Sequence, residues 1–162
     1  MKAEYKITED DYVKALKLYG KLTPKLIIIY AVAIIILVLL AIYGSQIIRG
    51  GAIGALVGGS IAVFGGRFVV APLLARRHYR KYKAIQEPMA VEFNDDGLMF
   101  YSTDAESKLK WNKILKWRQN SDYILVYLMP RLYHVIPKPL SNIGFKIDKL
   151  VALLEQNVGK ET

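Results

Sequence analysis

Residues 26–43 (LIIIYAVAIIILVLLAIY) form an uninterrupted run of 18 apolar residues, which constrains the fold more than any other feature of the chain. As an α-helix this run would be about 27 Å long, close to the hydrocarbon thickness of a bilayer. A cleavable signal peptide is the competing interpretation, but the charged segment before the run is too long and a second apolar run follows at once. The run therefore predicts a transmembrane helix over residues 25–45.

The second apolar run, residues 52–74, follows a short Gly-bounded turn at residues 44–51. It contains five glycines, one proline and Arg67, but also eleven large apolar residues. These should outweigh the arginine, which costs about 2.5–3.5 kcal/mol at the bilayer centre. Together the two runs predict a transmembrane helical hairpin over residues 25–75.

The net charge of +9 is concentrated beside these runs. Residues 76–86 (RRHYRKYKAIQ) contain five basic residues and no acid, whereas residues 87–162 contain ten basic and ten acidic residues. A nucleic-acid-binding domain would carry its positive charge across the folded domain, so this class is disfavoured. Six lysines precede the first run and only Arg49 lies in the turn, so the positive-inside rule predicts cytoplasmic termini.

The basic segment after the second run is the first candidate site. We expect the second helix to continue to about Gln86, which would give Arg76, Arg80 and Lys83 an i, i+4, i+7 spacing. Near an anionic leaflet each basic residue is worth up to about 1 kcal/mol. The segment is therefore interpreted as a topology signal alone, which is favoured, or as a site that binds acidic lipids and fixes the pose of the cytoplasmic domain. The predicted lipid-binding residues are Arg76, Arg77, Arg80, Lys81 and Lys83.

Small residues recur every four positions in the second run, at Gly54, Gly58, Ala62 and Gly66. Such a stripe lets another helix approach closely. The first helix of the same chain is the favoured partner, and a homodimer or a different membrane protein is the alternative. Arg67 borders the stripe, where it either extends to the cytoplasmic headgroups or binds a partner protein inside the membrane.

After Pro88 the pattern changes to short segments typical of strands. We expect strands at residues 89–93, 98–103, 107–112, 114–118, 123–129 and 132–136, and a last helix at about 143–157. Gly97 ends a tight turn at a position that often needs a positive φ. Trp111 alternates with lysines and is expected in the sheet core, whereas Trp117 is left open between core and surface.

The N-terminal segment adds a short strand at residues 3–8 and a helix at residues 9–20, where Thr8 and Asp11 fit a capping box. The predicted fold class is α+β, with an antiparallel sheet domain capped by a C-terminal helix. Four segments are expected: residues 1–24 (N-terminal strand and amphipathic helix), 25–75 (hairpin), 76–87 (basic juxtamembrane helix extension) and 88–162 (cytoplasmic sheet domain).

No catalytic or metal-binding constellation stands out in the sequence. The chain has no cysteine, and His78 and His134 lie far apart with no carboxylate at ligand spacing. Asp95 and Asp96 precede Gly97 and are typical of a turn. We therefore expect a protein that is not an enzyme and that uses no cofactor, no metal and no nucleic acid.

Short motifs in the sheet domain carry a family resemblance. They are Phe93, Gly97 and Leu98 in the first hairpin, Trp111 and Ile114 after the second turn, and Ile136-Pro137-Lys138 before the last helix. Over about residues 88–157 the chain resembles the YcxB-like family of bacterial membrane proteins. The resemblance implies a pleckstrin-homology-like cytoplasmic domain and a location in the bacterial inner membrane, but no reaction. Pro139 stands where a second basic residue would be expected, which argues against a paired basic site there.

The predicted function is that of a non-catalytic inner-membrane protein whose cytoplasmic domain is a binding or scaffold domain. The alternative is an immunity protein against a membrane-acting or pore-forming toxin. The expected partners are a bilayer with anionic lipids and an unknown protein, which would be a toxin under the alternative.

Overall fold

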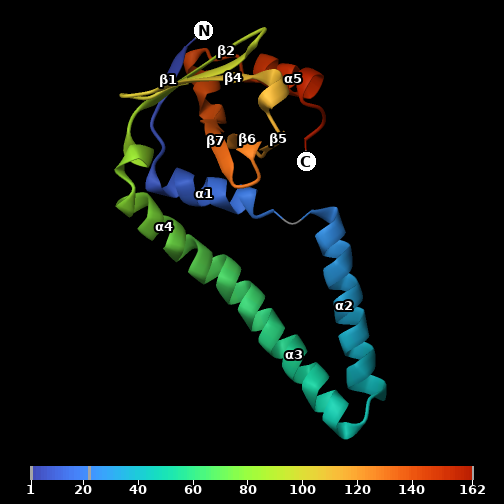
Figure 1. Ribbon diagram of the computed structural model, residues 1–162. Coiled ribbons are helices and arrows are strands. Elements are labelled where there is room, and N and C mark those ends of the chain that lie inside the picture. Colours follow the sequence, from blue (N-terminus) through green and yellow to red (C-terminus); the bar gives the residue numbers. More distant parts are fainter. Residues whose placement is uncertain (1, 22, 162) are drawn as a thin grey trace. The chain divides into compact units, whose positions relative to one another are not determined.

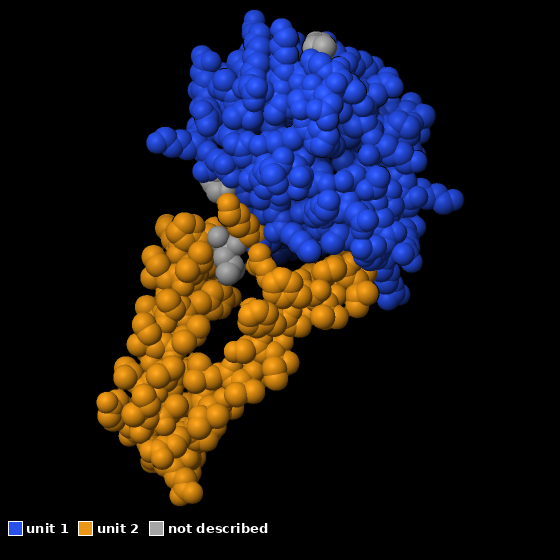
Figure 2. All heavy atoms as spheres, turned by 180° about the vertical axis from the view of Figure 1, so that it is seen from behind, with its two compact units in different colours: residues 1–20, 76–162 blue, residues 21–75 orange. Residues whose placement is uncertain are grey.

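The computed structural model describes residues 2–21 and 23–161, and the chain divides into two compact units. Unit 1 comprises residues 1–20 and 76–162, and unit 2 comprises residues 21–75 (Figure 1, Figure 2). Unit 1 is therefore built from two separate stretches of the chain, and unit 2 is inserted between them.

Unit 2 consists of long apolar helices joined by a tight turn. α2 spans Pro24–Tyr43, and α3 (Gln46–Gly65) continues through the π-helical turn η1 (Gly66–Val70) into α4 (Ala71–Lys81). Thr23 caps α2 by accepting a hydrogen bond from the backbone N–H of Leu26. Gly44 allows the turn, because a Cβ at this position would overlap the carbonyl oxygen of Leu40.

Two helical stretches, Pro24–Tyr43 and Gln46–Lys81, are long and apolar enough to cross a membrane. Their large side chains are exposed, as in Ile36 at 51% and Val57 at 56%, which distinguishes them from the core helices of a soluble protein. The prediction of two long apolar helices is confirmed.

Unit 1 contains two antiparallel sheets, with the strand orders β1-β2-β3-β4 and β5-β6-β7. The strands are β1 (Ala3–Tyr5), β2 (Met89–Asn94), β3 (Gly97–Tyr101), β4 (Glu106–Lys110), β5 (Lys116–Gln119), β6 (Tyr123–Met129) and β7 (Leu132–Pro137). With the C-terminal helix α5 (Ile147–Asn157), they confirm the predicted α+β fold class.

β1 joins the two stretches of unit 1. It pairs antiparallel with β2 in the register Ala3↔Val91 and Tyr5↔Met89. The strand that precedes the hairpin thus hydrogen-bonds to the first strand after it, so the chain leaves unit 1 and returns to the same sheet. If the hairpin spans a bilayer, this pairing requires both of its ends to lie on one side of that bilayer.

α1 (Glu9–Tyr19) begins where the local sequence predicts. Thr8 Oγ1 accepts a hydrogen bond from the Asp11 N–H, and Asp11 Oδ2 accepts one from the Thr8 N–H at 3.0 Å, so the capping box is complete. Ala15 and Leu18 of α1 pack in a cluster with three β6 side chains, namely Tyr123, Leu125 and Tyr127.

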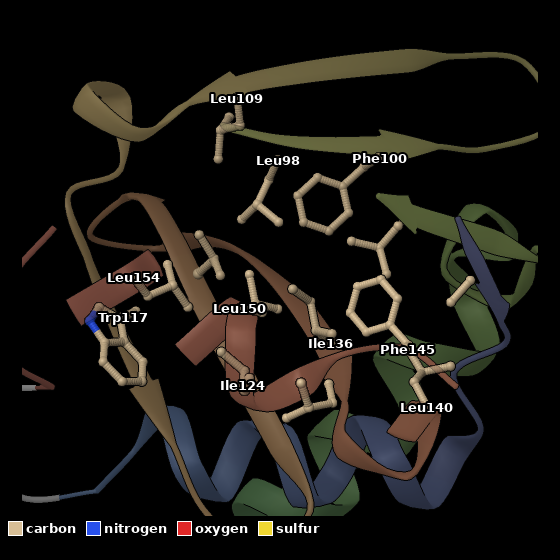
Figure 3. Packing of buried hydrophobic residues seen from close by; sticks show 14 of the residues in the cluster. Leu98, Phe100, Leu109, Trp117, Ile124, Ile136, Leu140, Phe145, Leu150 and Leu154 are labelled. Atoms are coloured by element: carbon tan, nitrogen blue, oxygen red, sulfur yellow. The ribbon is translucent and has the colours of Figure 1, made fainter. Parts of the chain in front are cut away.

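The main hydrophobic core lies between the two sheets and α5. Its members, most of them labelled in Figure 3, include Leu98, Phe100, Leu109, Ile124, Val126, Ile136, Leu150 and Leu154. β6 contributes to both clusters because successive side chains of a strand point to opposite faces. Ile124 and Val126 therefore face the main core, while Tyr123, Leu125 and Tyr127 face α1.

The predicted last helix, residues 143–157, is wrong at its N-terminal end. A 3₁₀ turn, η4 (Lys138–Ile143), is followed by Gly144 with a φ of 89°, a conformation that glycine adopts at no steric cost. α5 begins only at Ile147. Ile143 was expected on the apolar face but is 63% exposed, whereas Leu150 and Leu154 are fully buried.

Both tryptophans lie in the core. Trp111 is buried as predicted, but it begins the 3₁₀ turn η3 (Trp111–Lys113) instead of lying within a strand over residues 107–112. Its indole N–H donates to the Asp95 carbonyl at 3.0 Å. Trp117 has no exposed surface, and its indole N–H donates to the Gly159 carbonyl at 2.8 Å. The question left open for Trp117 is therefore decided in favour of the core.

Gly97 is required for a different reason from the one predicted. Its φ is not positive, since the glycines with positive φ among the described residues are Gly144 and Gly159. A Cβ at Gly97 would instead overlap the carbonyl oxygen of Leu109 on the neighbouring strand β4. The close approach of the two strands, and not the turn conformation, demands glycine here.

Candidate functional site

The basic segment after the hairpin contacts acidic residues of α1 within unit 1. Arg80 donates to both carboxylate oxygens of Glu9, with Nε–Oε2 and Nη2–Oε1 distances of 3.0 Å. Arg76 donates to Glu9 Oε1 at 3.2 Å and to Asp10 Oδ1 at 2.8 Å. Two of the predicted lipid-binding residues are therefore paired with acids of the same unit.

The first turn of α1 is a favourable place for these acids. The unsatisfied N–H groups at a helix N-terminus attract negative charge, and Glu9 and Asp10 lie in that turn. The hydrogen bond from Arg80 lowers the pKa of the Glu9 carboxyl. Arg76 also lowers this pKa, whereas partial desolvation raises it by a smaller amount. The hydrogen bond to Glu9 raises the pKa of Arg80. Because the Arg80 side chain remains 71% exposed, the pair orients α4 more than it stabilises the unit.

Tyr79, on the buried side of α4, contacts the N-terminal segment at Ile7 and Tyr12. Its hydroxyl donates to the Ile7 carbonyl at 2.8 Å, and its ring lies 6.0 Å from that of Tyr12 on α1. The Gln86 side-chain amide donates to the Tyr79 carbonyl at 2.8 Å. In a continuing helix the Lys83 N–H would bond to that carbonyl, so the Gln86 amide takes the place of this donor at the end of the helix.

The prediction of a helix as far as Gln86 is therefore wrong. α4 ends at Lys81, Tyr82 is extended with a φ of −103°, and Lys83–Gln86 form the 3₁₀ turn η2. The i, i+4, i+7 pattern is broken after Arg80, because Lys83 does not continue the same helical face. Arg77 and Lys81 are exposed on α4 and Lys83 is exposed on η2. Their binding to acidic lipids stays a prediction.

The small-residue stripe of α3 does not contact α2. A Cβ built at Gly54, Gly58 or Gly66 would have no non-neighbouring heavy atom within 4 Å, and Ala62 is exposed. The buried residue of α3 is instead Ala52, which is 4% exposed and lies nearer the hairpin turn. The two helices diverge away from that turn (Figure 1), so the expectation that the first helix covers the stripe is wrong. A second copy or another membrane protein stays a prediction.

Arg67 lies in the π-helical turn η1, which the sequence did not predict. Such turns insert one extra residue into a helix and are frequent at functional sites. The side chain is exposed. Extension to the headgroups and contact with a partner protein both stay predictions.

Unit 1 also has an open depression of about 670 Å³ formed by residues of α5, η4 and the β5–β6 end of the second sheet. The polar lining residues are Gln119, Ser121, Lys138, Ser141, Asp148 and Glu155, and the apolar ones are Ile147, Val151 and Ala152. The lining thus combines both signs of charge with an apolar strip on α5.

The histidines are placed for packing. His134 stacks on Phe100 with 3.9 Å between ring centroids, and burial lowers its pKa. His78 lies beside the Tyr82 ring at 4.5 Å. Among residues 2–21 and 23–161, no group of three or more His, Asp or Glu residues is placed to hold a metal ion.

Sequence reasoning missed the partners of the basic segment. Glu9, Asp10, Tyr79 and Gln86 were not singled out, although Glu9-Asp10-Asp11 is the only run of three acids in the chain. Opposite charge on two predicted helices, on either side of a hairpin, was the signal that would have identified the ion pairs.

A family model described as YcxB-like protein matches residues 93–139, from the end of β2 to the start of η4. The match includes every motif residue that carried the predicted resemblance, which is thereby confirmed over this segment. Leu98, Trp111 and Ile136 are buried there, so the matched residues bear on the fold more than on any chemistry. No curated protein and no solved structure gives a significant match to the chain.

Proposed function

We propose that the chain is a non-catalytic binding protein of the bacterial inner membrane, with unit 2 spanning the bilayer and unit 1 in the cytoplasm. The observation that carries the proposal is the pairing of β1 with β2, which makes the hairpin an insertion within unit 1. A domain connected at both ends of a membrane hairpin has less orientational freedom than one on a single linker. The lysines before the hairpin and the basic segment after it support the cytoplasmic side.

Anionic lipid is the proposed lipid partner. Arg77, Lys81 and Lys83 are exposed and follow the hairpin directly in the sequence, where positive charge favours an anionic leaflet. Arg76 and Arg80 are engaged by Glu9 and Asp10. We therefore assign lipid affinity to the first three residues and the orientation of α4 on unit 1 to the other two.

The open depression beside α5 is the proposed site for a protein partner. Its apolar strip and its charges of both signs suit a peptide segment, and three lining residues, Gln119, Ser121 and Lys138, lie within the family match. Two antiparallel sheets closed by a C-terminal helix support the pleckstrin-homology-like description. The immunity alternative stays a prediction from the sequence.

The lipid assignment is tested with full-length protein in nanodiscs with and without anionic lipid. Gln substitutions at Arg77, Lys81 and Lys83 should increase hydrogen exchange in unit 1 only in the anionic discs, and added salt should reduce the difference because it screens surface charge. Gln substitutions at Lys108, Lys110 and Lys149 remove the same charge from other exposed positions and should have no effect. Equal responses of the two triple variants would overturn the assignment.

Topology and the protein partner are tested separately. Reporter fusions at both termini should give cytoplasmic signals, and one at the residue 44–51 turn should give a periplasmic signal. Val151→Asp should abolish co-purification of the proposed partner without changing insertion. Retention of the same co-purified proteins by this variant would exclude the depression as the site.

A further inference from the structure

Exposed apolar side chains gather at one end of the second sheet. Leu115, Met129 and Leu132 are 55%, 61% and 53% exposed. Met129 pairs directly with Leu132, so the two side chains share one face of the β6–β7 hairpin. The Leu115 N–H donates to the Tyr127 carbonyl at 2.8 Å, which places Leu115 at the same end of the sheet.

The backbone at this end is shaped by a β-bulge. The pairing register shifts between Tyr127 and Met129, and only Pro130 and Arg131 separate the paired residues Met129 and Leu132. Bulges bend a strand and redirect its side chains. The bulge therefore lies immediately before the residues that present the exposed apolar surface.

The charges around this surface have one sign. Lys113 and Arg131 are exposed beside it, and Lys116 holds its ammonium 5.1 Å from the Tyr127 ring centroid. Residues 111–118 and 127–134, which form this end of the sheet, contain no Asp or Glu. We define the tip patch as Lys113, Leu115, Lys116, Met129, Arg131 and Leu132. Apolar side chains with basic residues beside them are the combination that binds the interface of an anionic bilayer.

The tip patch is connected to the start of the first apolar helix through two stacked tyrosines. Tyr133, next to Leu132, stacks on Tyr19 at the end of α1 with 5.2 Å between centroids. In Figure 1 the end of the β6–β7 hairpin lies beside the C-terminal end of α1. Pro24, where α2 begins, follows Tyr19 by five residues, a span of at most about 18 Å.

We propose that the tip patch is a second membrane contact, in which Met129 and Leu132 enter the lipid interface while the surrounding basic residues contact anionic headgroups. The inference rests on the proposed membrane span of unit 2, because the short connection from Tyr19 to Pro24 then keeps the tip patch near the bilayer surface. It assigns to the sheet domain a lipid contact that is separate from the basic segment on α4 and η2.

The test uses the absence of cysteine from the chain. Single cysteines carrying an environment-sensitive fluorophore are introduced in the full-length protein at Pro130, at Ser121 and at Ile35. Pro130 lies between the two apolar residues of the tip and leaves both intact, and Ser121 lies in the turn at the opposite end of β6. Ile35 lies within α2 and reports the span itself. The proteins are reconstituted in anionic nanodiscs with and without a lipid whose acyl chain carries a spin-label quencher.

The quencher should reduce fluorescence at Pro130 several-fold more than at Ser121, and Ser substitutions at Met129 and Leu132 should return the Pro130 signal to the Ser121 level. Equal quenching at Pro130 and Ser121, with strong quenching at Ile35, would overturn the tip contact while the span stands. A blue shift at Pro130 without lipid quenching would indicate a protein surface and would also overturn it. Loss of quenching at Ile35 would overturn the span as well.

Discussion

Arg80 and Glu9, which lie 71 residues apart, form a two-point ion pair with both N–O distances at 3.0 Å. The whole of unit 2 lies between them in the chain. The pair therefore connects α1, which precedes the hairpin in the chain, with α4, which follows it. Tyr79, hydrogen-bonded to Ile7, makes a second connection of the same kind.

Charge reversal tests this connection. Glu9→Lys or Arg80→Glu alone should increase hydrogen exchange of the α4 amides, because each leaves like charges facing each other. The double variant should restore part of the protection, since the opposite charges are exchanged across the same contact. Glu4→Lys, an exposed change on β1, is the control and should leave α4 unchanged. No recovery in the double variant would contradict the pairing.

The same contact should depend on pH in the acidic range. Because the folded-state pKa of Glu9 lies below its ordinary value of 4.5, its contribution is complete above that value. It is lost as the pH falls through the lower folded-state pKa, when the carboxyl is protonated. Hydrogen exchange of α4, corrected for its intrinsic pH dependence, should show the loss of protection. Glu9→Gln should remove this pH dependence, and its persistence in that variant would assign it to another group.

Trp117 should be one of the most sensitive positions of unit 1. Its ring is fully buried, so Trp117→Ala should lower the free energy of unfolding by about 3–5 kcal/mol. Lys113→Ala removes an exposed side chain nearby and should change it by less than about 0.5 kcal/mol. Hydrogen exchange of the β6 amides in the full-length protein in detergent measures both. Similar values would show that Trp117 is not part of the core.

Gly97→Ala tests the close approach of β3 and β4. The added Cβ would overlap the Leu109 carbonyl oxygen, so one strand must shift, and a cost of about 1–3 kcal/mol is expected. Gly20→Ala is the matched control, because its Cβ would meet the Leu16 carbonyl oxygen at an ordinary 3.4 Å and its φ is −79°. Exchange of the β3 and β4 amides should increase only in the first variant.

The hairpin can be tested at two positions of α3. Ala52 is buried, so Ala52→Leu should force α2 and α3 apart and increase exchange of their amides in detergent. Gly58→Leu should leave this exchange unchanged, because a Cβ there would lie in open space, with no non-neighbouring heavy atom within 4 Å. Increased exchange in Gly58→Leu but not in Ala52→Leu would show that the small-residue stripe is the contact between α2 and α3. If Gly58→Leu lowers the apparent size of the protein in detergent, the stripe holds a second copy.

The local sequence was sufficient for elements that depend on neighbouring residues. The apolar run at residues 26–43 determined α2, Thr8 and Asp11 determined the start of α1, and the pattern of β6 predicted its bounds as Tyr123–Met129. The basic segment was identified, but the helix that carries it was predicted five residues too long. Its end involves a hydrogen bond from the Gln86 side chain to the Tyr79 carbonyl, which the local pattern does not reveal.

By itself, the sequence determined that this chain has two long apolar helices, an antiparallel sheet domain and a basic segment, since each follows from periodicity, length or local charge. Only the tertiary structure decided that β1 pairs with β2, that Arg76 and Arg80 face Glu9 and Asp10, and that Trp117 is buried. The physical reason is that these contacts join surfaces distant in the chain. Their partners depend on how the sheets and helices pack together, and the pattern of either segment alone does not contain that information.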